Sequence, residues 1–355
     1  MSSKPRLAIV AGDPGGGAAL VPVVELLDAL QWPCHLYAYA ESLDNWTARG
    51  WPVRPAEQLQ VDSIGGLICA TSVNAQMYEL DWLAAARAKG IPSLAVLDFW
   101  SNYLARFQKA GQTTLPDALA VPDALAREEM IAAGFDAASL HITGQPALDR
   151  LASIMPLSPA RRRALREACG VREGQQLALW VSQPLRMIAQ RLGQPAAIDE
   201  QQACLALEQV LAQLGEPIAL RVKPHPRESR ADFAELGQVW PDSRLVPDSV
   251  LAHELLICAD IVIGIHSMML FEACQLGCRV LSYQAGLAPE DDPLPSNRAG
   301  WSWRCAAAEA LPAMLKRALT ESLPRPPKPD GQAAQRIIEQ MAYQITAQEN
   351  RQESA

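Results

Sequence analysis

The sequence has no long apolar run, no excess of positive charge and no paired cysteine motifs. It nowhere reaches the roughly 18 consecutive apolar residues of a membrane-spanning helix. It shows no secretion-signal pattern at its start either, so we expect a cytoplasmic protein. Its 31 basic and 39 acidic side chains give a net charge of -8, which excludes a general nucleic-acid binder. A local basic pocket for a phosphate group remains compatible with that charge.

Metal ligands at recognisable spacing are also lacking. The eight cysteines are scattered, and Cys274 and Cys278 have no second pair or histidine nearby at zinc-site spacing. We therefore expect reduced core cysteines and no metal site. What is present is 49% hydrophobic and 20% charged residues over 355 positions, ordinary values for a globular protein. At roughly 150 residues per domain, this length suggests two domains.

Apolar strand-like runs alternate with helical patterns along the chain, which favours parallel sheets built from β-α units. The strands predicted in the first half are Leu7–Val10, His35–Tyr39, Gly66–Ala70, Ser93–Leu97, Ala118–Val121 and Leu140–Thr143. Those in the second half are Leu177–Ser182, Ile218–Lys223, Arg244–Val246, Asp260–Gly264 and Arg279–Tyr283. We predict an α/β protein with two doubly wound lobes that divide near Ser153–Pro159. A terminal helix, Ala333–Gln348, follows the proline-rich stretch Pro324–Pro329.

The loops after the strands are the candidate sites, because ligands of open α/β sheets bind beyond the carboxyl ends of the strands. After the first predicted strand come Asp13 and then Gly15, Gly16 and Gly17, ahead of a helix predicted from Val21. Such glycines let a phosphate or a sugar approach free amides, although close packing of helix on sheet requires them equally. Asp13 is placed to act as a general base, with a simple turn residue as the alternative.

The second-lobe strand Ile218–Lys223 runs into a histidine between two prolines. The segment reads Lys223-Pro224-His225-Pro226-Arg227, so the backbone around His225 is restricted and a cation stands on each side. A fixed imidazole beside two cations suits an anionic ligand such as a diphosphate, to which it can donate a hydrogen bond or a proton. A structural histidine is the alternative.

The loop after Asp260–Gly264 carries His266 and Ser267 and leads into another predicted helix. Free amides at the start of that helix, at Ser267, Met268 and Met269, predict an anion site. Ser267 either caps the helix or hydrogen-bonds a phosphate. Glu272, further along the helix, is placed to accept hydrogen bonds from ribose hydroxyls.

Two further strand ends carry polar residues. Ser182 and Gln183 follow the first strand of the second lobe and are candidate ligand contacts, with a polar turn as the alternative. Asp98 follows Ser93–Leu97 in a loop that mixes aromatic and polar residues, as acceptor pockets often do. It is a second candidate base, with a packed loop as the alternative.

Together these residues resemble the GT-B superfamily of nucleotide-sugar glycosyltransferases and the related non-hydrolysing UDP-N-acetylglucosamine 2-epimerases. The most specific part is Leu255–Tyr283, LLICADIVIGIHSMMLFEACQLGCRVLSY, which is similar to the donor-binding segment of that superfamily. Val121–Leu148 resembles the stretch that closes its first lobe. Lys223–Glu228, KPHPRE, resembles the His-Pro motif of bacterial sialyltransferase-like, polysialyltransferase and CDP-glycerol transferase groups, in which the histidine contacts the nucleotide phosphate.

The resemblance implies the GT-B fold with a ligand cleft between its lobes. It implies an acceptor domain over residues 1–155, a nucleotide-sugar donor domain over 156–328, and a terminal segment, 329–355, whose helix packs back on the first lobe. Ser267 to Met269 would hold the donor phosphates, and Glu272 the ribose or the sugar. The general pattern implies a UDP-linked donor and the His-Pro motif a CMP- or CDP-linked one, as substrate and without a cofactor.

Two segments depart from the epimerases. Their Thr-Glu-Arg-Pro-Glu segment corresponds to Ala285–Asn297, AGLAPEDDPLPSN, and their Glu-Ala-Gly-Leu-Arg loop to Asp98-Phe99-Trp100. We therefore predict a metal-independent glycosyltransferase that acts on a polysaccharide or glycoconjugate acceptor. His225 would stabilise the leaving phosphate, and Asp13 or Asp98 would be the base. A nucleotide-sugar 2-epimerase or hydrolase and a non-catalytic nucleotide-binding protein are the alternatives. Peripheral membrane association and the oligomeric state stay open.

Overall fold

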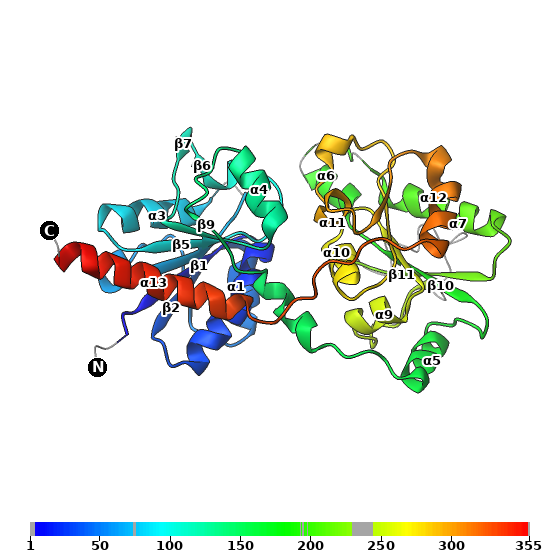
Figure 1. Ribbon diagram of the computed structural model, residues 1–355, viewed down its shortest axis with the longest axis horizontal. Coiled ribbons are helices and arrows are strands. Elements are labelled where there is room, and N and C mark those ends of the chain that lie inside the picture. The colour runs from blue at the N-terminus through cyan, green and yellow to red at the C-terminus, as the bar shows by residue number, and fades with distance from the viewer. Residues whose placement is uncertain are drawn as a thin grey trace. The chain divides into compact units, whose positions relative to one another are not determined.

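The computed structural model describes residues 4–73, 76–191, 193, 195–196, 198–228 and 244–353. The chain divides into two compact units. Unit 1 comprises Met1–Ser153 with Pro329–Ala355, and unit 2 comprises Ile154–Lys328. Each unit is a parallel sheet covered by helices, so the predicted α/β class with two Rossmann-like lobes is confirmed (Figure 1).

Unit 1 is built on a seven-stranded parallel sheet in the order β3-β2-β1-β4-β5-β8-β9. The strands are β1 (Leu7–Ala11), β2 (Cys34–Ala38), β3 (Val53–Pro55), β4 (Gly66–Ala70), β5 (Ser93–Val96), β8 (Ala118–Val121) and β9 (Leu140–Ile142), and a separate hairpin joins β6 (Gln108–Lys109) to β7 (Gln112–Thr113). The α-helices are α1 (Pro14–Ala29), α2 (Ala40–Ala48), α3 (Tyr78–Ala88), α4 (Ala124–Ala132) and α13 (Ala333–Glu353). Short 3-10 helices are η1 (Val61–Ser63), η2 (Ala105–Phe107) and η3 (Pro146–Ser153). The strand order reverses between β1 and β4, where doubly wound sheets bind their ligands.

The last helix of the chain belongs to the core of unit 1. Ile337 and Met341 of α13 are fully buried in one cluster with side chains of β1 and α1. Figure 1 shows α13, in red, beside α1. The Asp149 carboxylate on η3 accepts hydrogen bonds from the first α13 amides, Ala333 N at 3.1 Å and Ala334 N at 3.0 Å. This carboxylate therefore caps the helix from a distant part of the chain.

α1 begins at Pro14, so the predicted helix start was too late and the three glycines lie in its first turn, not in a loop. Proline is tolerated there because the first amides of a helix have no intrahelical partner. A Cβ on Gly16 would lie 2.7 Å from the Cβ of Ala70, and one on Gly17 would lie 2.2 Å from the Oγ of Ser42. Glycine is therefore required where α1 packs closely on its neighbours. These glycines carry no apolar periodicity, which is why the sequence pattern missed the helix start.

Unit 2 is built on a five-stranded parallel sheet in the order β11-β10-β12-β13-β14. The strands are β10 (Gln176–Val181), β11 (Ile218–Lys223), β12 (Ile261–Gly264), β13 (Val280–Tyr283) and β14 (Trp303–Cys305). The α-helices are α5 (Pro159–Ala168), α6 (Leu185–Arg191), α7 (Glu200–Gln213), α9 (Ala252–Cys258), α10 (Met268–Gln275), α11 (Pro295–Arg298) and α12 (Leu311–Thr320), with 3-10 helices η5 (Pro289–Asp291) and η6 (Ala308–Ala310). The order reverses between β10 and β12.

The core of unit 2 explains its layers. Trp180 of β10 and Ile263 of β12 point to one face, where α7 and α12 cover them with Leu207 and Leu315 among others.

The predicted strand at Arg244–Val246 was wrong, because within the described residues this segment makes only an isolated bridge from Leu245 to Val222. Among the described residues, every helix is too short or too polar to span a lipid bilayer.

Candidate active site

The candidate donor residues of unit 2 follow three neighbouring strands. The register places Val181, the last residue of β10, opposite Lys223 of β11 on one side and Gly264 of β12 on the other. The loops that start with Ser182, Pro224 and Ile265 therefore begin side by side at the carboxyl edge of the sheet, next to the reversal in strand order. The structure thus brings together segments that the sequence places about 40 residues apart.

His225 is held by its own loop. The backbone amide of Arg227 donates to His225 Nδ1 at 3.1 Å, and the backbone amide of His225 donates to Glu228 Oε2 at 2.6 Å. Because Nδ1 accepts, the neutral ring carries its proton on Nε2. Burial lowers the pKa of His225, and the charges of Arg227 and Lys223 lower it further. The imidazole is therefore mainly neutral at pH 7, with one N–H available as a donor.

Glu228 is a residue of this loop to which the sequence pattern assigned no role. Its Oε1 accepts a hydrogen bond from Ser182 Oγ at 2.9 Å, so both carboxylate oxygens are engaged. Glu228 therefore ties the loop after β11 to the end of β10, and the Ser182 hydroxyl proton points to this carboxylate. The available signal was its place in the KPHPRE motif, three residues after His225.

His266 and Gln183 join the loops after β12 and β10. The backbone amide of His266 donates to Gln183 Oε1 at 2.9 Å, and Gln183 Nε2 lies 3.2 Å from His266 Nδ1. Burial lowers the pKa of His266, while a hydrogen bond to its backbone and the charge of Asp292 oppose the shift. Ser267 Oγ accepts from the Met269 amide at 3.3 Å and caps α10, which is one of the two roles considered for it.

The remaining candidate donor contacts differ in exposure. Lys223 is half-buried, and its Nζ donates to the carbonyl of Pro224 at 3.0 Å. Arg227 is exposed. Met268 and Glu272 are half-buried on α10. Unit 2 therefore has two cations, Lys223 and Arg227, on either side of His225 in the chain.

A buried polar cluster supports the loop of His266 from within unit 2. Gln284 Nε2 donates to the Ile265 carbonyl at 3.3 Å and to Asp292 Oδ1 at 2.8 Å. Arg304 pairs with Asp292 at 3.0 Å. The sequence pattern assigned no role to these three residues, because their contacts join the connection after β13 to the loop after β12 and to β14.

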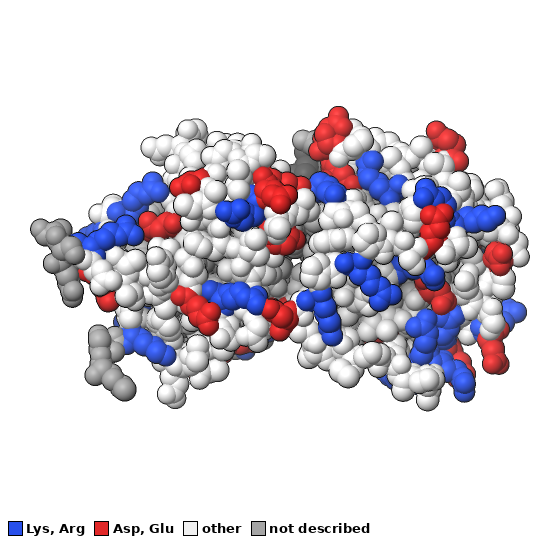
Figure 2. All heavy atoms as spheres, viewed as in Figure 1, with Lys and Arg blue, Asp and Glu red and all other residues white. Residues whose placement is uncertain are grey.

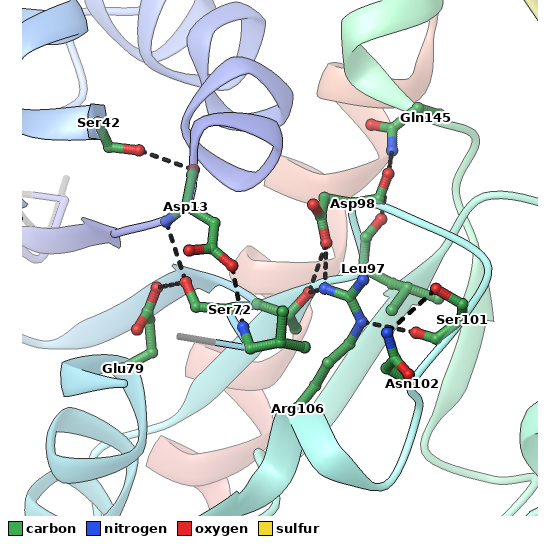
Figure 3. Close-up of polar contacts among 12 residues, drawn as sticks. Asp13, Ser42, Ser72, Glu79, Leu97, Asp98, Ser101, Asn102, Arg106 and Gln145 are labelled. Atoms are coloured by element: carbon green, nitrogen blue, oxygen red, sulfur yellow. Dashed lines mark hydrogen bonds and ion pairs between the residues drawn. The ribbon is translucent and has the colours of Figure 1, made fainter. Parts of the chain in front are cut away.

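In unit 1, Asp13 lies at the reversal in strand order, immediately before α1 (Figure 3). Its side chain does not cap the helix. Oδ2 accepts from the Val73 amide at 2.9 Å, and Oδ1 is buried without a hydrogen-bond partner among the described residues. Burial raises the pKa of Asp13, the Val73 hydrogen bond opposes this, and the charge of Asp98 adds to it. A carboxyl group with an unpaired oxygen and a raised pKa has the features of a general base.

Asp98 has a different environment. Its Oδ1 accepts from Arg106 Nη1 at 2.5 Å and from Thr71 Oγ1 at 2.9 Å, and its carbonyl accepts from Gln145 Nε2 at 2.6 Å. A Cβ on Gly15 would lie 2.6 Å from Asp98 Oδ2, so the α1 turn closes over this carboxylate. Asp98 thus holds a buried guanidinium through Oδ1, and of the two candidate bases only Asp13 has a fully buried oxygen without a hydrogen-bond partner among the described residues. The sequence did not single out Arg106 or Thr71, and it placed Gln145 only in a turn after the strand Leu140–Thr143.

Glu79 of α3 adds a third acid to this region. Its Oε1 accepts from Ser72 Oγ at 2.7 Å and its Oε2 from the Tyr39 hydroxyl at 2.6 Å. Ser72 Oγ in turn accepts from the Asp13 amide at 3.1 Å. Burial raises the pKa of Glu79 to about 7, although both hydroxyl hydrogen bonds oppose the shift. The sequence pattern assigned no role to Glu79.

Known proteins resemble this chain in structure and not in sequence. No family model matches it, and no curated protein matches it. The UDP-GlcNAc 2-epimerase of Methanocaldococcus jannaschii, in complex with UDP-GlcNAc and UDP, is similar with a TM-score of 0.64 and 12% identity over 95% of this chain and 99% of that chain. The Neisseria meningitidis UDP-GlcNAc 2-epimerase bound to UDP-GlcNAc is similar with a TM-score of 0.62 and 12% identity, over 95% of this chain and 100% of that chain. MurG of Acinetobacter baumannii is similar with a TM-score of 0.58 and 12% identity, over 95% of this chain and 99% of that chain. The chain therefore has the predicted GT-B fold.

Proposed function

We propose that this protein is a metal-independent glycosyltransferase that moves a sugar from a nucleotide-sugar donor to a hydroxyl of a polysaccharide or glycoconjugate. The observation that carries the proposal is the carboxyl edge of the unit 2 sheet. There, a neutral His225 with its proton on Nε2 stands between two cations, Lys223 and Arg227. The likeness to proteins crystallised with UDP or UDP-GlcNAc supports a nucleotide-sugar as the ligand.

The donor side of the reaction falls to unit 2. The bond between the anomeric carbon of the sugar and the phosphate oxygen breaks, and negative charge develops on the departing nucleotide. His225 Nε2–H donates to that phosphate, and Lys223 and Arg227 neutralise its charge. Gln183 and Ser182 hold the surrounding loops in place, while Ser267, Met268 and Met269 at the start of α10 contribute to the phosphate site. Glu272 accepts from the ribose or sugar hydroxyls.

The acceptor side falls to unit 1. Asp13 removes the proton from the acceptor hydroxyl as its oxygen attacks the anomeric carbon. The unpaired Oδ1 is the oxygen that takes this proton, since Oδ2 already accepts from Val73. Asp98 and its partner Arg106 hold the neighbouring loop, and Gly15, Gly16 and Gly17 let the first turn of α1 pack closely beside it.

A second candidate is a nucleotide-sugar 2-epimerase or hydrolase, which the likeness to two UDP-GlcNAc 2-epimerases favours. The same donor site would then act without an acceptor. The two activities separate in one assay. Conversion of UDP-GlcNAc alone identifies the epimerase or hydrolase, and sugar transfer only in the presence of a glycan acceptor identifies the transferase. Lack of turnover of UDP-, CMP- and CDP-linked sugars with a panel of acceptors would overturn both.

Asp13→Asn tests the assignment of the base. Asparagine keeps the size of the side chain and an oxygen for the Val73 amide, but it cannot take a proton at neutral pH. We expect the rate of transfer to fall about 100-fold or more while donor affinity stays unchanged. Asp44→Asn, at an exposed acid of α2, is the matched control and should behave like the wild type. Equal rates for the Asp13 and Asp44 variants would remove Asp13 from the mechanism.

A further inference from the structure

A cavity of about 370 Å³ lies in unit 2 at the edge of the sheet opposite to the candidate donor loops. Its lining includes Asp260, Arg279 and Trp301, which come immediately before or near the first residues of β12, β13 and β14. In a parallel sheet all strands start at the same edge, so this cavity and the loops after the strands are at different ends. The segment Leu323–Pro326 also lines the cavity.

Three arginines line the cavity, and only one of them has a hydrogen bond or ion pair among the described residues. Arg162 donates to the Ile257 carbonyl at 2.7 Å and lies 3.3 Å from Asp260 Oδ1. Arg279 and Arg325 are exposed and have no hydrogen bond or ion pair with any residue in the described ranges. Figure 2 shows basic side chains gathered over the part of unit 2 where α5 and α9 lie.

The acids of the same cavity already have partners. Asp260 pairs with Arg166 at 2.9 Å in addition to Arg162, and it accepts from the Leu177 amide at 2.7 Å. Glu321 pairs with Arg317 at 3.1 Å, one helical turn away. The positive charge of Arg279 and Arg325 is therefore left without a counter-charge from these acids.

The local backbone restricts the position of Arg325. Pro324 and Pro326 stand on either side of it and limit its backbone, and Pro326 is buried. Gly277, with a φ of +77°, lies beside the guanidinium, because a Cβ there would be 3.0 Å from Arg325 Nη1. The proline-rich stretch thus places Arg325 at the cavity, and Arg325 is not part of the proposed donor site.

We propose that this cavity binds a small phosphate-bearing molecule, with its phosphate between Arg279 and Arg325. The planar guanidinium groups match a phosphate in pairs of hydrogen bonds, better than ammonium groups do. The volume is in the range of sites for small molecules, which is enough for a sugar or nucleoside attached to the phosphate. Arg325 lies just before the point where the chain re-enters unit 1, so the occupant holds the segment that leads to α13.

Calorimetric titration of the full-length protein with pyrophosphate and with glucose 1-phosphate tests this site. We expect the double variant Arg279→Gln, Arg325→Gln to bind both at least about tenfold more weakly at one class of sites. Arg325→Lys keeps the charge but loses the paired hydrogen bonds, so we expect it to weaken binding too, although less than the double variant does. Arg191→Gln, at an exposed arginine of α6 outside the cavity, is the control and should bind like the wild type. Circular dichroism confirms that each variant is folded.

The proposed donor site also attracts pyrophosphate, so Lys223→Gln is titrated in parallel. Loss of binding in Lys223→Gln alone, with the double arginine variant unchanged, would overturn the second site and leave the donor site standing. Loss of pyrophosphate binding in the double arginine variant alone would support the second site. It would also show that Lys223 does not contribute to pyrophosphate binding. Binding of the protein to phosphatidylglycerol vesicles that depends on these arginines, without binding of either soluble phosphate, would contradict a small-molecule site.

Discussion

Three carboxyl groups near the reversal in strand order of unit 1 differ in what surrounds them. Asp98 is paired with a guanidinium, Glu79 accepts from two hydroxyl groups, and Asp13 keeps one oxygen without a partner among the described residues. Burial raises the pKa of both Glu79 and Asp13. Asp98 therefore forms an ion pair and Glu79 is a buried hydrogen-bonded acid, and Asp13 is the residue that we propose for the proton transfer.

Glu79 makes the stability of unit 1 depend on pH. Its pKa is raised from 4.5 to about 7 on folding, so the folded state binds the proton more tightly. Its contribution is complete below about pH 4.5 and is lost as the pH rises to about 7, with a slope of at most about 1.4 kcal/mol per pH unit. We expect Glu79→Gln to remove that slope in guanidinium unfolding measured from pH 5 to 8. Glu57→Gln, at an exposed site, should keep it, and an unchanged slope in Glu79→Gln would contradict the buried acid.

Among single residues, the sequence predicts the candidate site residues that follow strands. It misses the residues that hold those side chains and loops in place. His225 and Asp13 stand out because Pro, Gly and charge surround them at strand ends. Glu228 and Arg106 do not, because their roles depend on partners that only the folded chain brings near, Ser182 for one and Asp98 for the other.

Among the elements, strands with a continuous apolar or β-rich run match their predicted positions, and two of the three-residue edge strands were missed. β4, β8 and β11 have the predicted bounds because each is a continuous apolar or β-rich run. β3 and β14 have three residues each at sheet edges, too few to show a pattern, and were not predicted. The order of strands in a sheet is likewise set by packing and not by any single segment.

The capping of α13 by η3 is an element-scale contact with a measurable effect. Asp149→Ala removes the acceptor for two amides of α13, and we expect unit 1 to lose about 1 kcal/mol of stability. Hydrogen exchange should quicken first at the start of α13. Asp62→Ala, which removes an exposed ion pair with Lys89, should have a smaller effect. Equal exchange in the two variants would show that the cap contributes nothing.

At the scale of the whole molecule, the chain leaves unit 1, forms unit 2 and returns. The polypeptide crosses between units at Ser153–Ile154 and again at Lys328–Pro329. The apolar residues of α13 are consequently part of a core formed mainly by residues more than 180 positions earlier. The sequence places the proline-rich break correctly before this helix, and the core of unit 1 explains why the helix is amphipathic.

Truncation after Lys328 tests this division. Removal of α13 exposes apolar residues of β1 and α1, so we expect the unfolding transition of unit 1 to shift to lower temperature or disappear. The transition of unit 2 should stay within a few degrees of its original position, since no residue of unit 2 is removed. Differential scanning calorimetry distinguishes the two. Equal shifts of both transitions would contradict two separate cores.

We propose that the carboxyl edge of the unit 2 sheet holds the nucleotide of a sugar donor. Calorimetric titration of the full-length protein with UDP, CDP and CMP tests it most directly, with His225→Ala and the exposed-site control Arg191→Gln in parallel. We expect that at least one of these nucleotides binds, that His225→Ala weakens its affinity about tenfold, and that Arg191→Gln leaves the affinity unchanged. Absence of binding by all three, or equal affinity in wild type and His225→Ala, would contradict it.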